Sequence, residues 1–528
     1  MTANEVGTGE VATGEVATGQ AFEDAPLVMW LDEITDGDTA IAGHKSVNLS
    51  KVRAMADRAT LADPADPGHT YSRPTVVPDG FVVTTRASAE LLKATGLESE
   101  LERLDAQHLR DDLSVHEDSE AARRLLAEAS VPVDVRSAIS TAYDRLSLTS
   151  GAGDFVVAVR SSATMEDSVG ASFAGQFDSV LGVRTIDELI QAYLKVIASS
   201  LSLRALSYRQ AISAQLDPPG RLDPPGQLDP PGQLDPPDWL DRPGDLVRSV
   251  SEMSVLVQRM VRSDRGSAGV LMTSVADPQK SQSAERVTII EAARGTGEGV
   301  VGGAVNPESH VVRLADNTIT RVPPCEAPPI LDVTTALELA VWGTRLETEF
   351  GSPVQIEWAR DGVTGELAVV QVRPMPDPAE TIGQEHVSSA IDLRSGLRVL
   401  TRGLAIGTGV VSGPAIVVDD PREFLEGDAV DRLPQRFILV VSTTSPDWVP
   451  LMRLASALVT DHGGRGSHAA IVCRELGLPA VLGCGDATTL LRSEQSLLSP
   501  GRADPSEHWE GHHVVVSCDE QAGGEVWG

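Results

Sequence analysis

The sequence has few cysteines, a deficit of positive charge and no long apolar run. Its four cysteines lie apart, without CxxC spacing, at Cys325, Cys473, Cys484 and Cys518. They suggest neither a disulfide framework nor a zinc site, and buried free thiols are expected. Lys and Arg number 43 against 76 Asp and Glu, a net charge of −33, which argues against nucleic-acid or anionic membrane partners. Without a bilayer-length apolar run or a signal peptide, a cytoplasmic protein is expected.

Length and low-complexity segments predict a protein of several domains. A chain of 528 residues with 41% hydrophobic and 23% charged residues is typical of about two to four globular domains with sizeable cores. Residues 1–24 contain a Gly/Thr/Val/Glu repeat and predict a disordered tail. Residues 215–243 form an insertion in which residues 215–237 repeat the unit QLDPPG, once as RLDPPG, and its Pro-Pro pairs exclude helix interiors and central strands. This insertion is interpreted as a polar surface loop, with a proline-rich ligand for a partner protein as the alternative.

Hydrophobic periodicity predicts where the ordered segments lie. Residues 186–211 have a helical pattern, and residues 254–261 and 269–274 predict two strands joined by the polar turn RSDRGS. The proline-rich insertion therefore lies inside one domain. Proline, glycine and charge without periodicity indicate a linker over residues 376–398. The predicted domains on either side of this linker cover residues 25–375 and 399–528.

The most specific segment is TDHGGRGSHAAIVCRELGLPAVLGCG, residues 460–485. Its three glycines can bring backbone N–H groups close to an anion, and Ser467 suits the N-cap of the helix that follows. His468 would then lie at a helix N-terminus, where free amides and the helix dipole favour a phosphoryl group. A neutral imidazole is a competent nucleophile near neutral pH. An incidental polar histidine is the alternative, and His462 is the rival carrier.

This segment resembles the phosphohistidine domain of phosphoenolpyruvate synthase, pyruvate phosphate dikinase and rifampicin phosphotransferase. The resemblance rests on T-x-x-G-G-x-x-x-H-A-A and on R-E-L-G-x-P-A-V-x-G, both present here. It implies that His468 carries the phosphoryl group, because His462 falls at a variable position. The end of the chain, GHHVVVSCDEQAGGEVWG, resembles the closing strands of that domain. The chain is therefore expected to lack the pyruvate-binding barrel and the drug-binding domain of these relatives.

Residues 28–375 resemble the ATP-grasp-like nucleotide-binding domain of the same family. AGHKSVNLSKV matches G-G-K-x-x-x-L with His44 at the second glycine, which implies that Lys45 contacts phosphate. VAVRSSATMEDSVGASFAGQ matches V-R-S-S-A-T-x-E-D…S-F-A-G-Q, and its Arg160 ends an apolar strand where a guanidinium can bind phosphate oxygens bidentately. A solvated lysine and a structural arginine are the alternatives for these two residues.

The resemblance implies further ATP contacts. Gly175 and Ser179 fall where the family contacts ATP on a flexible lid. SVLVQRMV resembles the strand and hinge that hold adenine, with Gln258 and Met260 as candidate contacts through backbone groups. Glu298, in a glycine-rich segment, is a candidate ribose contact. Simple core packing and chain turning are the alternatives for these segments.

A predicted hairpin, VQIEWARDGVTGELAVVQVRP, carries the last nucleotide motif. Symmetry about Thr364 would place Glu357 opposite Gln371, with Arg373 on the same face. These residue types match the family's E…Q-x-R pattern, which implies Mg²⁺ held by Glu357 and Gln371, with Arg373 compensating phosphate charge. The family usually has Asp where this chain has Gln355, so altered metal binding is expected.

Together these observations predict an α/β and α+β multidomain protein with an ATP-grasp-like nucleotide-binding domain followed by a small swivelling β/α phosphohistidine domain. The resemblance implies a dikinase-type phosphotransferase that uses ATP and Mg²⁺. It would move the β-phosphoryl group of ATP to His468 and on to an acceptor, releasing AMP and phosphate. The acceptor would be a small molecule, bound between the domains or presented by a separate protein. Ligase-like substrate activation and a non-catalytic nucleotide-binding remnant are the alternatives.

Overall fold

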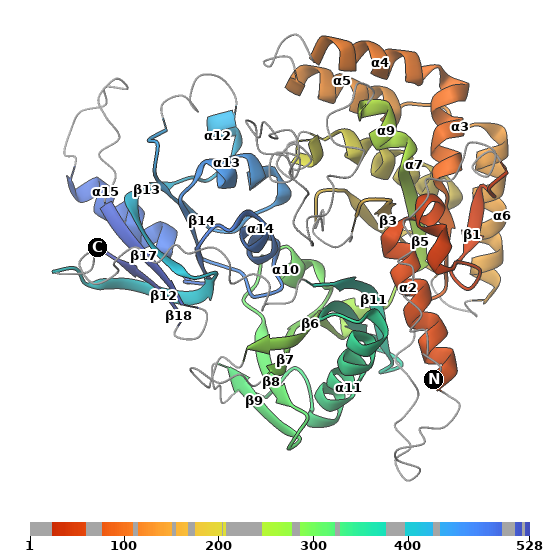
Figure 1. The fold of residues 1–528 in the computed structure, drawn as a ribbon. Helices are drawn as coiled ribbons and strands as arrows, with labels where there is room; N and C mark the ends of the chain where they lie inside the picture. The colour runs from red at the N-terminus through yellow and green to blue at the C-terminus, as the bar shows by residue number, and fades with distance from the viewer. Residues whose placement is uncertain are drawn as a thin grey trace, which may run out of the picture.

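The computed structural model places three bodies around a common centre (Figure 1). The expected disordered tail, the proline-rich insertion and most of the expected linker lie outside the described residues. The described residues are 24–59, 77–108, 115–149, 155–166, 175–202, 204–206, 245–276, 286–322, 328–375, 396–425, 433–498, 513–519 and 523–528.

The first lobe is built on a five-stranded antiparallel sheet with the order β1-β2-β5-β3-β4. The middle of strand β5 is apolar because both faces of the sheet are covered: Val255 and Val257 enter the core that contains α7, and Leu256 enters the core that contains α2. The elements of this lobe are β1 (Val28–Trp30), η1 (Asp36–Asp38), α2 (Thr39–Ala59), β2 (Gly80–Val83), α3 (Thr85–Thr95), α4 (Leu97–His108), α5 (Val115–Ala127), α6 (Val133–Thr149), β3 (Val157–Ala163), β4 (Ser179–Val183), α7 (Ile186–Ala198), η2 (Ser199–Leu201), α9 (Asp245–Ser251) and β5 (Met253–Arg259).

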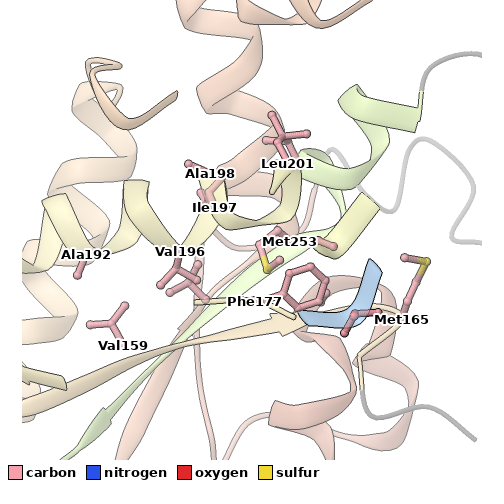
Figure 2. Close-up of a cluster of buried hydrophobic side chains, with 14 of the residues drawn as sticks. Val159, Met165, Phe177, Ala192, Val196, Ile197, Ala198, Leu201 and Met253 are labelled. Atoms are coloured by element: carbon pink, nitrogen blue, oxygen red, sulfur yellow. The ribbon is translucent and has the colours of Figure 1, made fainter. Parts of the chain in front are cut away.

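Helix α7 begins at a capping box formed by Thr185 and Glu188 and ends at Ala198, so the helical segment predicted over residues 186–211 is interrupted there; residues 204–206 are helical again, and residues 207–211 lie outside the described residues. The Ser199 and Ser200 hydroxyls donate to carbonyls three residues earlier, at 2.6 and 2.7 Å. Such bonds compete with the helical pattern, and the chain tightens into a 3₁₀ turn. Figure 2 shows the apolar side chains of this region gathered between α7 and the strands, with Phe177 among them.

The second lobe is a six-stranded antiparallel sheet with the order β11-β10-β6-β7-β8-β9, against which α11 packs. The two strands predicted on either side of RSDRGS are present, but β5 and β6 lie in different sheets, so this turn carries the chain from one lobe to the other. The elements are η3 (Ser263–Arg265), β6 (Ser267–Ala276), β7 (Arg286–Arg294), α10 (Glu298–Val301), β8 (Glu308–Arg313), β9 (Thr318–Val322), α11 (Val333–Phe350), β10 (Val354–Arg360) and β11 (Leu367–Pro374).

The hairpin of β10 and β11 has the predicted register at its open end. Glu357 pairs with Gln371, and Gln355 pairs with Arg373. A bulge after Glu357 then pairs Trp358 with Val369, so the symmetry about Thr364 fails nearer the turn. The bulge lies beyond the pairs that carry the predicted site, so those pairs keep their places.

Residues 396–528 form the third body, called here the barrel domain. Seven strands form a closed barrel in the order β12-β16-β15-β14-β13-β17-β18. The neighbouring pairs β13–β14, β14–β15 and β15–β16 are parallel. The short apolar strands ILVV and ALVT are fully buried, as parallel strands covered on both faces are. The elements are β12 (Val399–Ile406), β13 (Gly409–Val417), α12 (Arg422–Leu425), β14 (Ile438–Val441), η6 (Pro446–Trp448), α13 (Val449–Leu454), β15 (Ala457–Thr460), α14 (His468–Leu476), β16 (Ala480–Leu482), α15 (Ala487–Leu498), β17 (His513–Asp519) and β18 (Gly523–Trp527).

The three cysteines within the described residues are free thiols. Cys473 and Cys518 are buried, and Cys484 is half-buried. Burial raises the pKa of Cys484 to about 12 and that of Cys473 further. These thiols are therefore structural, as the sequence predicts, while Cys325 lies outside the described residues. None of the described helices has both the length and the apolar character required to cross a bilayer.

Gly43 interrupts α2 and lets it approach β3 closely. Its φ of 72° and ψ of 158° are non-helical, and a Cβ here would lie 1.8 Å from the Ser162 carbonyl oxygen. Ser162 also ties the two elements, because its Oγ donates to the Ala42 carbonyl at 2.8 Å and accepts from the Ser46 amide at 3.1 Å. This close approach fixes the helical turn that carries Lys45.

Gly43→Ala is expected to lower the free energy of unfolding by about 3 kcal/mol or more, because it adds a clash to an unfavourable backbone conformation. Gly96→Ala is the matched control: Gly96 also has a positive φ, 71°, but nothing lies within 4 Å of a Cβ there. The control should cost about 1–2 kcal/mol. Denaturant unfolding of the two variants checks this, and equal costs would contradict the packing role.

Candidate active site

The candidate active site lies where the N-terminus of α14 faces the two lobes (Figure 1). His468 is the first residue of α14 and is only 3% exposed. Ser467 caps the helix by accepting a hydrogen bond from the Ala470 amide at 3.4 Å. Gly175, from the first lobe, lies so near that a Cβ on it would be 3.2 Å from His468 Cδ2. Two residues predicted from separate motifs therefore meet across the domain interface.

The His468 ring has one partnered and one unpartnered nitrogen. Nδ1 lies 3.3 Å from Thr444 Oγ1. Nε2 is buried and has no hydrogen-bond partner among the described residues. Burial, reinforced by the guanidinium groups of Arg204 and Arg373, lowers the pKa of His468 to about 3. The ring is therefore neutral at physiological pH, and an unpaired buried nitrogen of this kind marks a group with a chemical task.

Lys45 is buried next to a carboxylate. Its Nζ lies 2.6 Å from Glu166 Oε1 and 3.4 Å from Ser161 Oγ, and both charged residues are at most 5% exposed. Glu166 belongs to the RSSATMED motif, but its pairing with Lys45 was not predicted. The preceding His44, at the departure from the family motif, has Nδ1 2.5 Å from the Thr164 carbonyl oxygen, and burial lowers its pKa. The lysine is thus held in place before any phosphate binds.

A carboxylate, an amide and a cation of the second lobe lie together with a cation of the first lobe, Arg160 on β3. Glu357 Oε2 lies 3.8 Å from Arg160 Nη1, which also donates to the Val370 carbonyl at 3.4 Å. Gln371 lies directly opposite Glu357 on the neighbouring strand. Arg373 is 7% exposed and contributes to the low pKa of His468. Arg160, Glu357 and Gln371 are therefore neighbours, and Arg373 is near enough to His468 to affect its pKa.

Gln355 accounts for the orientation of Arg373. Its Oε1 accepts a hydrogen bond from Arg373 Nη2 at 2.8 Å, and both side chains are buried. An amide supplies the acceptor without supplying a negative charge. The departure from the family's Asp therefore preserves the orientation of the guanidinium and leaves its charge uncompensated by this neighbour.

Arg204 joins the two domains beside His468, although no motif pointed to it. Its Nε donates to the Gln176 carbonyl at 2.9 Å, and it forms an ion pair with Asp178. Across the interface, its Nη1 lies 3.5 Å from Asp447 Oδ1. Arg204 lies in the segment for which periodicity predicted only a helix, and the docked arrangement reveals its position beside His468.

The remaining predicted contacts are less tightly placed. Ser179 is exposed on β4, directly opposite Arg160. The Gln258 side chain donates to the Pro78 carbonyl at 3.2 Å, and the Met260 amide donates to Val156 at 2.9 Å. These groups are used by the fold. Glu298 is exposed at the start of α10, so the nucleotide contacts of these four residues stay predictions.

The glycine loop before α14 binds the carboxyl group of Glu291 in this structure. Glu291 of β7 accepts hydrogen bonds from the Arg465 amide at 2.6 Å and from the Gly466 amide at 2.9 Å. Burial raises the pKa of Glu291, while the two amide bonds oppose that shift. Nearby, Asn306 Oδ1 accepts from the Gly463 amide at 3.0 Å. The loop thus binds the second lobe when the domains are docked.

Comparison with known proteins identifies both parts of the chain. Residues 39–390 match the family described as pyruvate phosphate dikinase, AMP/ATP-binding domain, and residues 433–503 match the PEP-utilising enzyme, mobile domain. The chain is 31% identical to the phosphoenolpyruvate synthase of Escherichia coli (strain K12), over 95% of this chain and 58% of that protein. It is 33% identical to the phosphoenolpyruvate synthase of Pseudomonas aeruginosa (strain UCBPP-PA14), over 93% and 57%. It therefore spans less than two thirds of these relatives' length.

Docking of the barrel domain should weaken in acid. The pKa of His468 is about 3 when docked and would return toward its ordinary 6.5 on exposure. The free energy that the neutral His468 ring contributes to docking is therefore fully present above about pH 6.5 and is lost as the pH falls toward 3. Between about pH 7.5 and pH 5 this histidine should weaken docking about 30-fold.

The radius of gyration from solution X-ray scattering checks this, and it should increase on acidification. In His468→Asn the increase should be smaller. Glu291, whose pKa is raised, favours docking in acid, but it is present in both proteins, so their difference isolates the histidine. Identical pH curves for the two proteins would contradict the assignment.

Proposed function

The chain belongs to the pyruvate phosphate dikinase family, and we propose that it is an ATP-dependent phosphotransferase that carries the phosphoryl group on His468. The observation that carries the proposal is the buried, unpartnered Nε2 of a neutral histidine. This nitrogen lies beside Gly175 and within the field of Arg204 and Arg373. A non-catalytic remnant would have no reason to retain such an arrangement.

The proposed nucleophile is Nε2, which requires the ring tautomer with its proton on Nδ1. With Nδ1 protonated and donating to Thr444 Oγ1, the lone pair lies on Nε2. Nε2 forms a bond to the β-phosphorus of ATP, and the bond from that phosphorus to the bridging oxygen of AMP breaks. Water then removes the γ-phosphate as inorganic phosphate, leaving phosphohistidine. Transfer to an acceptor breaks the N–P bond and returns the lone pair to Nε2.

Three buried or half-buried cations are suited to the charge of the phosphates. Lys45 lies on helix α2, Arg160 on strand β3 and Arg373 on strand β11, and α2 packs against both strands. Fixed cations in a site shielded from water stabilise developing charge without reorganising. The Glu166 carboxylate would share Lys45 with a bound phosphate, because the two side chains are already in contact.

Glu357 and Gln371 suit Mg²⁺. They present hard oxygen atoms side by side on adjacent strands, and Glu357 is 22% exposed. No group of three or more His, Cys, Asp or Glu side chains in the described ranges is arranged to hold a metal. Mg²⁺ commonly takes one or two carboxylates and completes its shell with phosphates and water. When bound, the ion would neutralise phosphate charge, and these two residues would hold it.

The acceptor is proposed to be a small molecule. The curated relatives are named phosphoenolpyruvate synthases, and this chain spans about three fifths of their length. We propose that the acceptor binds between the barrel domain and the lobes or on a separate acceptor-binding protein. The net charge of −33 favours neither nucleic acid nor a membrane as partner, and a cytoplasmic location fits this proposal.

Incubation with Mg²⁺ and ATP labelled at the β position should give acid-labile, base-stable label on the protein. The label should be lost in His468→Asn, because Nε2 is removed, and retained in His462→Asn. Nucleotide binding by His468→Asn, measured by calorimetry, should stay within about twofold of the original protein, because the lobes are unchanged. Label from the γ position alone, or label retained in His468→Asn, would refute the carrier role.

Glu357→Gln is expected to raise the Mg²⁺ concentration needed for half-maximal labelling by about tenfold, because one carboxylate ligand becomes neutral. Glu366→Gln is the control, since Glu366 is an exposed carboxylate on the same hairpin. A magnesium titration of the labelling rate checks both variants. Unchanged titration curves for Glu357→Gln would reject its assignment as a metal ligand.

A further inference from the structure

Glu291 is a buried carboxylate whose polar partners lie in another domain. It is 2% exposed on β7, and its two oxygens accept the Arg465 and Gly466 amides at 2.6 and 2.9 Å. The positive charges that lower its pKa, Arg465 and Arg474, also belong to the barrel domain. A buried carboxylate is strongly destabilising without such partners. Glu291 therefore depends on the barrel domain for its hydrogen bonds.

The glycine loop is shaped around this carboxylate. A Cβ on Gly464 would lie 2.7 Å from both oxygens of Glu291 and 2.8 Å from Pro307 Cγ. A Cβ on Gly466 would lie 2.9 Å from the Val270 side chain. Neither glycine has the positive φ that only glycine readily adopts, so close approach to the second lobe accounts for both.

The contact can set orientation in a way that apolar packing cannot. One hydrophobic cluster runs from Phe177 in the first lobe into the barrel domain at Trp448 and Ala469. Apolar burial attracts without directing, whereas a carboxylate that accepts two adjacent amides fixes both position and angle. The amides belong to the residues just before Ser467 and His468. A small shift of this loop would therefore displace the nucleophile itself.

We infer that Glu291 is a positioning residue whose carboxylate docks the barrel domain and aligns His468 for attack on the nucleotide. The alignment of His468 for attack rests on the proposed function, whereas the docking role of Glu291 does not. When the barrel domain leaves, the Arg465 and Gly466 amides lose their acceptor and Glu291 is exposed to water. Breaking this contact is then part of the step that carries the phosphoryl group away from the nucleotide.

Two variants test the contact from opposite sides. Glu291→Gln keeps the size of the side chain but places an NH₂ group against backbone N–H. Gly464→Ala leaves Glu291 intact and fills the space that its carboxylate occupies. Asp316→Asn is the control, because Asp316 is an exposed acid in the turn between β8 and β9 whose hydrogen bonds stay within that turn. Thermal unfolding of each variant verifies that the lobes remain folded.

Both variants should lower the single-turnover rate of His468 labelling at saturating ATP by about tenfold or more, while nucleotide affinity stays within about twofold. Both should also increase the radius of gyration from X-ray scattering, and Asp316→Asn should change neither quantity. A purely structural role would lower stability and affinity together, without this separation. The inference is overturned if Glu291→Gln and Gly464→Ala keep the radius of gyration and the His468 labelling rate of the original protein.

The scattering separates this inference from the proposed function. If the original protein takes no label from ATP but Glu291→Gln and Gly464→Ala still expand it, the docking contact stands and the proposed chemistry fails. If the two variants expand the protein and label at the original rate, docking through Glu291 does not align His468, and the positioning role is wrong.

Discussion

A neutral imidazole buried between cations is the constraint on which this site depends. His468 is uncharged because burial and two guanidinium groups oppose its protonation. The cations lie in the nucleotide-binding lobes and the imidazole lies in the barrel domain, so the low pKa of His468 depends on docking. The close packing at Gly175, the Arg204 bridge and the Glu291 contact all serve that one encounter. Undocking returns the ring to solvent, where it becomes an ordinary titrating histidine.

Gln355 and Arg373 illustrate how a neutral residue preserves geometry while changing electrostatics. The amide oxygen accepts from the guanidinium as a carboxylate would. Because Gln355 adds no negative charge, Arg373 acts more strongly on its other neighbours, including His468 and any bound phosphate. Gln355 therefore changes the charge balance of the site while keeping the hydrogen bond to Arg373.

Local sequence patterns correctly predicted the positions of residues that are fixed by neighbouring residues in the chain. The hairpin placed Glu357 opposite Gln371 because strand alternation and a single turn fix the register. The glycine loop and the N-cap residue Ser467 likewise predicted that α14 starts at His468, because a helix cap depends on residues that are adjacent in the chain. Glu291, Arg204 and the Lys45 partner Glu166 act across distant segments, and no periodicity reports such contacts. The assignment of β5 and β6 to different sheets likewise depends on long-range pairing.

The lack of space at Gly464 links two parts of the chain that would otherwise be interchangeable. The residue at this position is limited by Glu291 and Pro307, which belong to another domain. A barrel domain taken from a relative would dock on these lobes only if its glycine loop also left room for Glu291 and Pro307. Chimeras between members of this family should therefore succeed or fail by the match of loop and lobe, and sequence changes on either side are expected to be inherited together.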